Sequence, residues 1–313
     1  MHVLITGANG FVGAALARRL LDDTQALPDL TRLTLIDLEF PTELNDPRVH
    51  YLSGSIADSK LLANALETPV DVLFHLASIP GGMAERNYPL SRQVNLDATQ
   101  TLFEGLKAQA TPARVVFAST IAVYGSPLPA QVDDSTPLQP KLTYGAQKLI
   151  GEILLEDFSR RGWIDGISLR LPGIVARPPQ PSGLLSAFMS DVFWKLAKGE
   201  RFECPVSSQA VAWWMSVARC VDNLLHAASL PASALQTRRS FALPVLRLTM
   251  EQVIGGLCRR FGEERQALVS YLPDAHLEAT FGAYPPLLSP AAEALGFKHD
   301  GDLEQLIYRT LNG

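Results

Sequence analysis

The sequence predicts an α/β protein with a doubly wound parallel sheet and a smaller, discontinuous C-terminal region. Through the first 170 residues, short apolar runs alternate with helical patterns, which is typical of a parallel sheet with helices on both faces. A glycine-rich stretch at 7–13 separates the first apolar run from the first helical pattern. Proline and glycine cluster at 172–183, and beyond them the alternation becomes irregular. These three observations define the expected fold class.

Five apolar runs predict buried parallel strands, because each is short and bounded by turn residues. They span 2–6, 33–38, 71–77, 114–119 and 166–171. The stretches between them carry the spacing of apolar residues that is typical of helices. The expected helices span 11–26, 58–67, 89–109 and 143–161.

The break at residue 172 divides the chain into two expected regions. Residues 1–172 form the domain built on the parallel sheet, and we expect the chain to return to it around 210–245, with a strand near 241–243. Residues 173–209 and 246–313 mix helices and short strands less regularly. We expect this second region to cover the ligand that the sheet domain binds.

Composition and charge exclude several classes of protein. The chain has 313 residues and a net charge of -5, with both signs interspersed. No nucleic-acid partner is expected, because phosphate contacts need clustered Lys and Arg. No apolar stretch approaches the roughly 18 residues of a membrane helix. The N-terminus shows no secretion signal and the three cysteines are scattered, so we expect a cytoplasmic protein without a membrane anchor, disulfide framework or bound metal.

The glycine-rich stretch has the form of a phosphate-binding turn. The segment 3–20 reads strand, turn and helix, with Gly7, Gly10 and Gly13 at every third residue. Such glycines let the backbone turn tightly and approach a pyrophosphate, which the N–H groups of the helix N-terminus bind. Asp37 ends the second expected strand, where its carboxylate is suited to accept hydrogen bonds from ribose hydroxyls and to repel a 2′-phosphate. The sequence therefore predicts NAD as cofactor, in preference to NADP.

A tyrosine and a lysine stand four residues apart in the expected helix 143–161. Tyr144 and Lys148 share one face of that helix, one turn apart. A free phenol is a poor base near neutral pH because its pKa is about 10, but a neighbouring ammonium stabilises the phenolate and lowers that pKa. Thr120 follows the fourth strand, at the edge where open α/β sheets bind ligands. These three residues predict proton transfer at a substrate alcohol.

Together these motifs resemble the extended short-chain dehydrogenase/reductase family, also called the NAD-dependent epimerase/dehydratase family. The matching parts are 6–13, Asp37, 75–78, 94–99, 119–125 and 144–148, in the family's order. The resemblance implies a Rossmann-like fold and an NAD-dependent enzyme. It also implies that Tyr144 is the acid/base, that Lys148 binds the nicotinamide ribose and lowers the pKa of Tyr144, and that Thr120 orients the substrate.

The same resemblance implies which residues contact NAD. Ser55 stands where the family usually has an aspartate beside the adenine, so Ile56 and the backbone are expected to contact the adenine. Ala77 is expected to line the cofactor groove, and Asn95 to be structural or part of a water relay. The full expected set is Gly7, Asn9, Gly10, Phe11, Val12, Gly13, Asp37, Ser55, Ile56, Leu76, Ala77, Ser78, Asn95, Ser119, Tyr144, Lys148, Pro172 and Ile174.

The segment 169–181 indicates which class of substrate the protein acts on. Sugar-nucleotide enzymes of the family usually have an asparagine for the diphosphate where this chain has Gly173. The segment resembles family dehydrogenases that act on small hydroxy acids, which implies oxidation of the C2 hydroxyl of a four-carbon sugar acid to a 2-oxo acid. Arg177 is the first candidate to bind the carboxylate, and one ring of the pair Trp213–Trp214 to close the pocket. The expected substrate contacts are Ser78, Thr120, Tyr144, Arg177 and Trp214.

Two other functions stay open at this point. A nucleotide-sugar epimerase would use the same tyrosine and NAD. A dehydratase is disfavoured, because Ile121 and Ala122 follow Thr120 where such enzymes usually have Asp-Glu. A non-catalytic NAD-binding regulatory protein is a more remote alternative, since such proteins commonly lose the tyrosine or the lysine that this chain has.

The resemblance also bears on partners. It implies a small-molecule substrate, a sugar acid. The expected helices 89–109 and 143–161 correspond to the pair through which family members often form a two-fold dimer. A homodimer is therefore expected.

Overall fold

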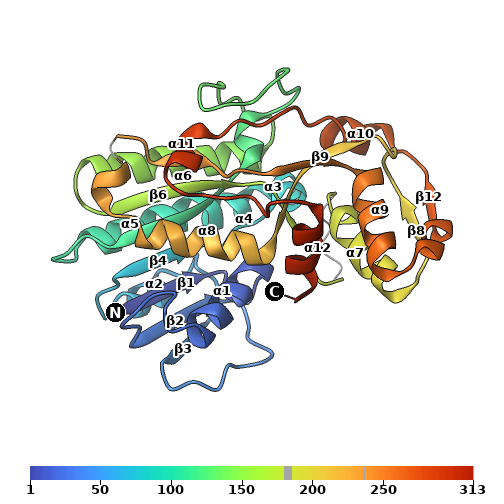
Figure 1. Ribbon diagram of the computed structural model, residues 1–313. Helices are drawn as coiled ribbons and strands as arrows, with labels where there is room; N and C mark the ends of the chain where they lie inside the picture. Colours follow the sequence, from blue (N-terminus) through green and yellow to red (C-terminus); the bar gives the residue numbers. More distant parts are fainter. Residues whose placement is uncertain (180–184, 236, 313) are drawn as a thin grey trace. The chain divides into compact units, whose positions relative to one another are not determined.

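A seven-stranded parallel sheet forms the core of the first of two units into which the chain folds (Figure 1). The computed structural model describes residues 1–179, 185–235 and 237–312. The strands are β1 (His2–Thr6), β2 (Arg32–Asp37), β3 (Val49–Ser53), β4 (Val72–His75), β5 (Arg114–Thr120), β6 (Asp165–Leu171) and β10 (Ser240–Ala242). They lie in the order β10–β6–β5–β4–β1–β2–β3. The sheet confirms the expected fold class.

The strand ends agree with the sequence analysis to within one residue, except at the end of β4, and one edge strand was not expected. All five expected strands are present, and β10 pairs parallel to β6, as expected for a strand near 241–243. β4 ends at His75, two residues before the expected end. β3 was not expected, because its partly exposed residues contain no run of buried apolar side chains. It is one of the two edge strands, and its neighbour in the strand order is β2.

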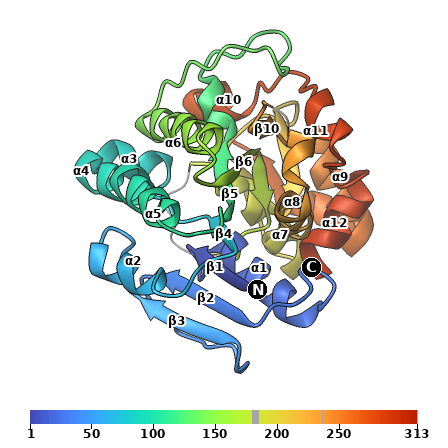
Figure 2. The ribbon, with the colours of Figure 1, turned by 90° about the vertical axis from the view of Figure 1, so that its left-hand side faces the viewer.

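Helices cover both faces of this sheet, as Figure 2 shows. α2 (Ser59–Ala65), α5 (Ala98–Lys107) and α6 (Thr143–Arg160) lie on one face, and α1 (Phe11–Asp22) and α8 (Val217–Ser229) on the other. The buried cluster on the first face includes Leu4, Ile36, Leu62, Leu73, Leu102, Phe103, Val115, Phe117 and Leu155. Burial of these side chains provides the main driving force for holding helices and strands together.

The expected helix 89–109 consists of three consecutive helical pieces. They are α4 (Tyr88–Arg92), a π-helical turn (Gln93–Asp97) and α5. A further short helix, α3 (Gly81–Arg86), precedes them. The apolar spacing predicted a continuous helix because a π-helical turn keeps the chain helical and inserts only a local bulge. Such bulges are frequent at functional sites.

The second unit is smaller and has two small sheets. β7 (Gly173–Val175), β9 (Val211–Ser216) and β11 (Leu246–Thr249) form one, in the order β11–β9–β7, and β8 (Phe202–Cys204) pairs with β12 (Val269–Tyr271) in the other. The longer helices are α7 (Phe188–Lys198), α9 (Met250–Phe261) and α12 (Leu303–Asn312). The shorter ones are α10 (Ala275–Phe281) and α11 (Pro290–Ala294).

The boundaries between the two units differ from the expected ones in two segments. The first unit contains Met1–Gly125, Leu138–Arg170 and Val221–Ala242, and the second contains Ser126–Pro137, Leu171–Cys220 and Leu243–Gly313. The returning segment therefore begins at Val221 and not around 210, because β9 pairs with β7 and β11 in the second unit. Residues 180–183 of the expected proline- and glycine-rich break lie outside the described residues.

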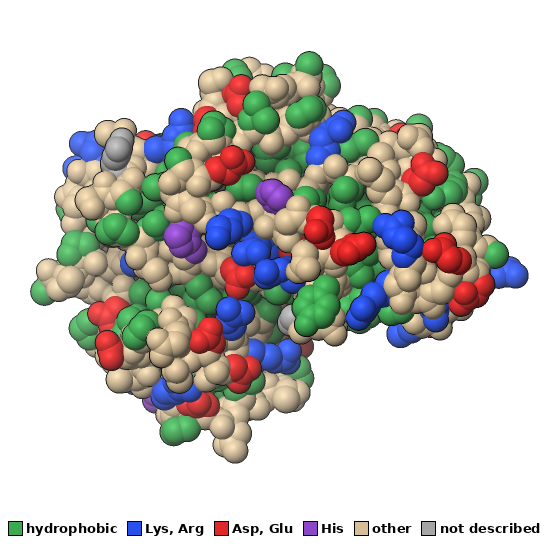
Figure 3. Space-filling view, viewed as in Figure 1, with side chains coloured by type: hydrophobic (Ala, Val, Ile, Leu, Met, Phe, Trp, Pro, Cys, Tyr) green, Lys and Arg blue, Asp and Glu red, His purple; other side chains and the backbone are tan. Residues whose placement is uncertain are grey.

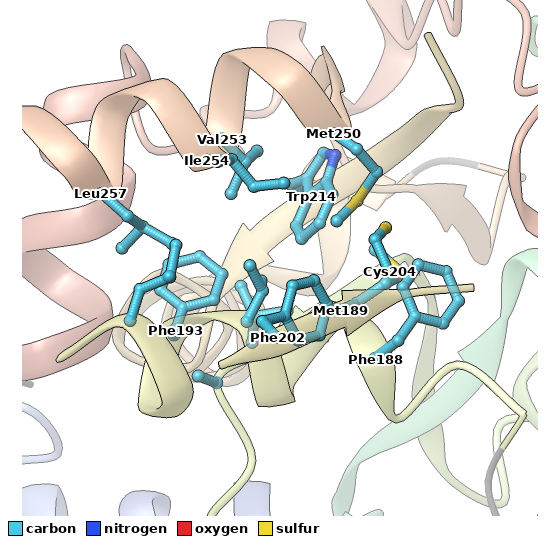
Figure 4. Close-up of a cluster of buried hydrophobic side chains, with 14 of the residues drawn as sticks. Phe188, Met189, Phe193, Phe202, Cys204, Trp214, Met250, Val253, Ile254 and Leu257 are labelled. Atoms are coloured by element: carbon cyan, nitrogen blue, oxygen red, sulfur yellow. The ribbon is translucent and has the colours of Figure 1, made fainter. Parts of the chain in front are cut away.

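The core of the second unit contains Trp214. Figure 4 shows its ring among side chains of α7, α9 and β8. Trp214 is 0% exposed and its Nε1 donates a hydrogen bond to the Leu248 carbonyl oxygen. Trp213 is equally buried and donates to the Pro285 carbonyl oxygen. Because neither ring has an exposed face, Trp214 is no longer a candidate substrate contact. Its bulk instead fills the core of this unit.

The surface carries both signs of charge. On the face shown in Figure 3, acidic and basic side chains are interspersed, in keeping with the modest net charge of -5. Among the helices of the described residues, none is long and apolar enough to span a bilayer. Within the same residues, no group of three or more His, Cys, Asp or Glu side chains is arranged to hold a metal ion.

Candidate active site

Two glycines let the turn after β1 pack closely against its neighbours. Gly7 has a φ of +72° and its N–H donates to the Ile36 carbonyl oxygen at 2.9 Å. A Cβ on Gly7 would lie 2.7 Å from the backbone nitrogen of Ala77, and a Cβ on Gly13 would lie 2.1 Å from the Gly7 oxygen. Neither clash involves a flexible side chain, so both positions require glycine.

Helix α1 begins directly after this turn. Gly10 is its N-cap, without a side-chain cap, and the first turn contains no acidic residue. The first N–H groups of a helix have no intrahelical partner and carry partial positive charge. The turn residue Asn9 and the first helical residues Phe11 and Val12 therefore lie at a cradle that fits a pyrophosphate.

The carboxylate of Asp37 lies beside the glycine turn. Oδ2 accepts a hydrogen bond from the Asn9 N–H at 2.8 Å, and Oδ1 accepts one from the Leu38 N–H at 2.7 Å. The carboxylate is thus oriented by the backbone at the carboxyl end of β2. Each carboxylate oxygen has further acceptor capacity, so Asp37 fits the hydroxyls of an adenosine ribose.

The segment after β3 differs from the family pattern in a way the structure explains. The Ser55 hydroxyl accepts a hydrogen bond from the Ala57 N–H at 3.1 Å, so it stabilises its own turn. Ile56 is 5% exposed and lines a cavity of about 230 Å³. The other residues around this cavity are Ala57, Ser59, Leu62, Gln93, Asp97, Ala98 and Thr101.

A buried histidine connects the glycine turn to α5. His75 Nδ1 lies 2.7 Å from Thr6 Oγ1, and Nε2 lies 2.8 Å from Thr99 Oγ1. Burial, followed by the charge of Lys148, lowers the pKa of His75 to about 3, so the imidazole is neutral. Thr99 donates to the carbonyl oxygen of Asn95, which makes Nε2 the donor and Nδ1 the acceptor. This tautomer lets Thr6 donate to His75.

Asn95 joins the loop after β4 to α6. Its side-chain oxygen accepts from the Ile79 N–H at 2.8 Å, and its amide donates to the Ile79 carbonyl oxygen and to Gln147 Oε1. Gln147 in turn donates to the Ser91 hydroxyl. Asn95 is 2% exposed and lies in the π-helical turn. These contacts hold Ile79, the residue after Ser78, against the π-helical turn and α6.

Thr120, Tyr144 and Lys148 lie at the carboxyl end of β5 and the start of α6. Thr120 is 9% exposed, and its Oγ1 accepts from the Ala122 N–H at 3.1 Å. Tyr144 is half-buried, whereas Lys148 is 2% exposed. Lys148 Nζ lies 6.0 Å from the Tyr144 ring centroid and 4.7 Å from that of Phe117. The ammonium is therefore close enough to stabilise a phenolate at Tyr144.

The surroundings of Lys148 determine how readily its side chain is protonated. Burial lowers the pKa of Lys148 to about 7, and the carboxylate of Glu152 opposes that shift. Glu152 is 3% exposed, accepts a hydrogen bond from the Ser119 hydroxyl, and pairs with Arg170 at 2.8 Å. The sequence analysis named Ser119 but missed Glu152 and Arg170. The spacing that linked Tyr144 to Lys148, four residues along one helix, also links Lys148 to Glu152.

Three further expected contacts belong to the second unit. Pro172 is buried and Ile174 is half-buried in β7. The Arg177 N–H donates to the Ser190 hydroxyl at 3.0 Å, and the Arg177 carbonyl oxygen accepts from Trp194 Nε1 at 2.7 Å. The backbone of Arg177 is thus held by two side chains of α7.

The fold and this site define an NAD-dependent oxidoreductase of the short-chain dehydrogenase type. The glycine turn and Asp37 fit the cofactor's pyrophosphate and ribose, and Tyr144 with Lys148 is an arrangement suited to acid–base chemistry. Residues 3–238 match the model of the NAD dependent epimerase/dehydratase family, and the chain belongs to that family. The expected family resemblance is confirmed.

Known proteins similar to this chain include dehydrogenases and one solved epimerase structure. The D-erythronate dehydrogenase of Cupriavidus necator is 38% identical over 98% of this chain and 97% of its own length. The D-erythronate dehydrogenase of Haemophilus influenzae is 34% identical over 99% of both. The crystal structure of a nucleoside-diphosphate-sugar epimerase from Agrobacterium tumefaciens superposes with a TM-score of 0.91, at 33% identity, and covers 98% of this chain and 92% of that one.

Proposed function

We propose that this protein oxidises the C2 hydroxyl of D-erythronate with NAD⁺ and yields the 2-oxo acid 2-dehydro-D-erythronate. The observation that carries the proposal is the 38% identity to a D-erythronate dehydrogenase over 98% of this chain. The reaction would be a step in the breakdown of sugar acids.

In the proposed reaction, proton and hydride leave the same carbinol group. Tyr144 removes the hydroxyl proton, and the ammonium of Lys148 stabilises the resulting phenolate. Thr120 holds the reacting oxygen through its hydroxyl at the end of β5. When bound, NAD supplies the nicotinamide ring that accepts the hydride. Because the two transfers are coupled, no free carbanion forms.

A small acid also needs a cation for its carboxylate. We assign this role to Arg177, whose guanidinium is suited to bind a carboxylate with two parallel hydrogen bonds. The support is the position of its backbone, held by Ser190 and Trp194 just beyond β7. Ser78, which follows β4 by three residues, is the proposed donor to a sugar hydroxyl.

We also propose a cytoplasmic homodimer. The described cysteines Cys204, Cys220 and Cys258 are buried free thiols, which favours a reducing compartment. Ile150 and Ile153 are 43% and 59% exposed on α6, and α6 covers most of the expected helix 143–161. Two large apolar side chains one turn apart on an exposed helix face favour association with a second copy.

The test is a screen of four- to six-carbon aldonates with purified protein. Initial rates of NADH formation are measured with NAD⁺ and separately with NADP⁺, for the parent and for Tyr144→Phe. We expect D-erythronate with NAD⁺ to give the highest kcat/KM. Tyr144→Phe should lower kcat by about 10²–10⁴-fold, the usual contribution of a general acid–base, while NAD still raises its melting temperature.

The remaining outcomes separate the alternatives. An epimerase, the activity named for the Agrobacterium neighbour, would convert a nucleotide sugar without accumulating NADH. A non-catalytic NAD-binding protein would give the same negligible rate in parent and Tyr144→Phe. A preference for another aldonate would overturn the substrate and leave the chemistry in place.

A further inference from the structure

A buried charge network surrounds the carboxylate of Glu152. Arg170 donates to it through Nη2 at 2.8 Å and through Nε at 3.0 Å, and the Ser119 hydroxyl donates to Oε1. Arg170 also donates to the Tyr124 hydroxyl at 3.2 Å. Glu152 is 3% exposed and Arg170 is 8% exposed. The carboxylate is therefore fixed in orientation and shielded from water.

This network joins the elements that carry the catalytic residues. Ser119 precedes Thr120 on β5, and Glu152 follows Lys148 by one turn of α6. Residues four apart on a helix are neighbours on its surface. Glu152 is thus placed to act on Lys148 electrostatically while being held by the strand that carries Thr120.

Several charged or titratable groups lie around Lys148. His75 on β4 and Tyr144 and Glu152 on α6 act on Lys148 directly. Arg170 on β6 lies behind Glu152, and Tyr124 on the 3₁₀ helix Ile121–Tyr124 contacts Arg170. The pKa of His75 is lowered to about 3 by burial and by Lys148, so its imidazole adds no charge near neutral pH. The Phe117 ring lies 4.7 Å from Nζ and contributes no formal charge.

An ammonium buried in such surroundings needs a fixed opposite charge to stay protonated. Burial lowers the pKa of Lys148 to about 7, into the range where the enzyme would work, and Glu152 supplies the opposing charge. A neutral Lys148 would no longer stabilise the phenolate of Tyr144. The charge state of Lys148 therefore depends on a buried carboxylate that is itself held by Ser119 and Arg170.

We propose that Glu152 is a positioning residue for proton transfer, whose carboxylate, oriented by Ser119 and Arg170, keeps Lys148 protonated beside the Tyr144 phenol. This inference rests on the proposed acid–base role of Tyr144 and Lys148. It adds a residue that touches neither substrate nor cofactor and acts through Lys148. Its signature is a change in pH dependence, which a merely structural residue would not cause.

The principal test is the pH profile of kcat/KM for Glu152→Gln. A unit charge about 6 Å away, at an effective dielectric constant near 20, corresponds to about two pH units. Arg170 keeps its charge in this variant, so its own effect on Lys148 is unchanged. We expect the rising limb of the profile to move up by as much as about two pH units. The rate should then fall by as much as about a hundredfold on the acid side and approach the parent's at high pH.

A second readout does not depend on turnover. Tyrosinate absorbance in the cofactor-free protein, taken as the difference from a Tyr144→Phe background, reports ionisation of Tyr144. This titration should shift upward by the same amount in Glu152→Gln. Glu152→Asp keeps the negative charge, so the rising limb of its kcat/KM profile should stay within a few tenths of a pH unit of the parent's.

Two further variants distinguish the loss of a charge beside Lys148 from a general loss of stability. Asp165→Asn breaks the ion pairs of Asp165 with Arg114 and Arg239 at the opposite end of β6, so it serves as a control for the loss of a paired carboxylate away from Lys148. It should lower stability and leave the pH profile unchanged. If Glu152→Gln does not fold, Glu152→Gln/Arg170→Met removes both charges, leaves no unpaired buried ion, and should still shift the limb upward.

The outcomes distinguish this inference from the proposed function. An inactive Tyr144→Phe together with unshifted profiles in Glu152→Gln and the double variant would overturn the role of Glu152 alone. An equal shift in Glu152→Asp would also overturn it, since the cause would then be geometry and not charge. A parent that turns over no faster than Tyr144→Phe would overturn the proposed function itself.

Discussion

His75 lies between Thr6 and Thr99 with both ring nitrogens in hydrogen-bonding contact, and it is fully buried. Its pKa is lowered from 6.5 to about 3, first by burial and then by the charge of Lys148. The unfolded chain therefore binds a proton between pH 6.5 and about 3 that the native protein does not bind. The stability from neutral His75 is complete above pH 6.5 and is lost as pH falls toward 3.

This linkage predicts a pH-dependent stability. Between pH 6.5 and about 4, the free energy of unfolding of the parent should fall by on the order of 1 kcal/mol per pH unit more than that of His75→Asn. Urea titrations at several pH values measure the difference. His50→Asn, the same change at an exposed position of β3, is the control. Parallel pH slopes for parent and His75→Asn would contradict a neutral buried imidazole.

At the residue scale, the sequence predicted the site residues that can be recognised from their local position in the chain. Tyr144 and Lys148 were found from their separation of four, and Asp37 from its place at a strand end. Arg170 and the threonines around His75 were missed, because their partners come from elements distant in the chain. Trp214 was misassigned because a sequence does not show which side of a short strand faces a core.

At the element scale, the turn between β1 and α1 is tightly constrained. A Cβ on Gly13 would lie 2.1 Å from the Gly7 oxygen and 2.9 Å from Ala8 Cα, both backbone atoms. The turn and the first turn of α1 would have to separate to admit it. That movement would displace the N–H groups that fit the pyrophosphate.

Gly13→Ala should therefore weaken NAD binding by more than tenfold and lower stability by about 1–3 kcal/mol, as overpacking does. Calorimetric titration with NAD⁺ and thermal unfolding measure the two effects. Gly255→Ala in α9 is the control, because its Cβ would meet only the Arg259 guanidinium at 3.7 Å. Alanine there should raise stability by about 0.5–1 kcal/mol and leave NAD binding unchanged. Unchanged NAD affinity in Gly13→Ala would contradict the assignment of this turn.

Some element boundaries were predicted closely from the sequence. β1 agrees with its expected range, and α6 ends within one residue of it. β3 was missed because an exposed edge strand leaves no apolar run. The π-helical turn was missed because the side chain of Asn95 stabilises the bulge through Ile79 and Gln147, which lie outside the helix itself.

At the scale of the whole molecule, the fold class follows from the alternation of strands and helices, whereas the division into units depends on strand pairing. β9 was expected within the returning segment, yet it pairs antiparallel with β11 and parallel with β7. Its sequence contains two tryptophans and a methionine, a composition that suits either core. Tertiary packing decides which strands pair when they are this far apart in the chain, and the local sequence does not show it.

The proposed homodimer gives the last prediction. Ile153, on the same helix as Tyr144, is 59% exposed in one copy of the chain, and a carboxylate there would be buried without a partner in a two-fold contact. Sedimentation velocity should show the parent at twice its 34.1 kDa mass and Ile153→Glu shifted toward the monomer. Leu288→Glu replaces a leucine that is 48% exposed in the second unit and should leave the dimer intact. A parent that sediments as a monomer, or an Ile153→Glu variant that dimerises as well as the parent, would contradict pairing through α6.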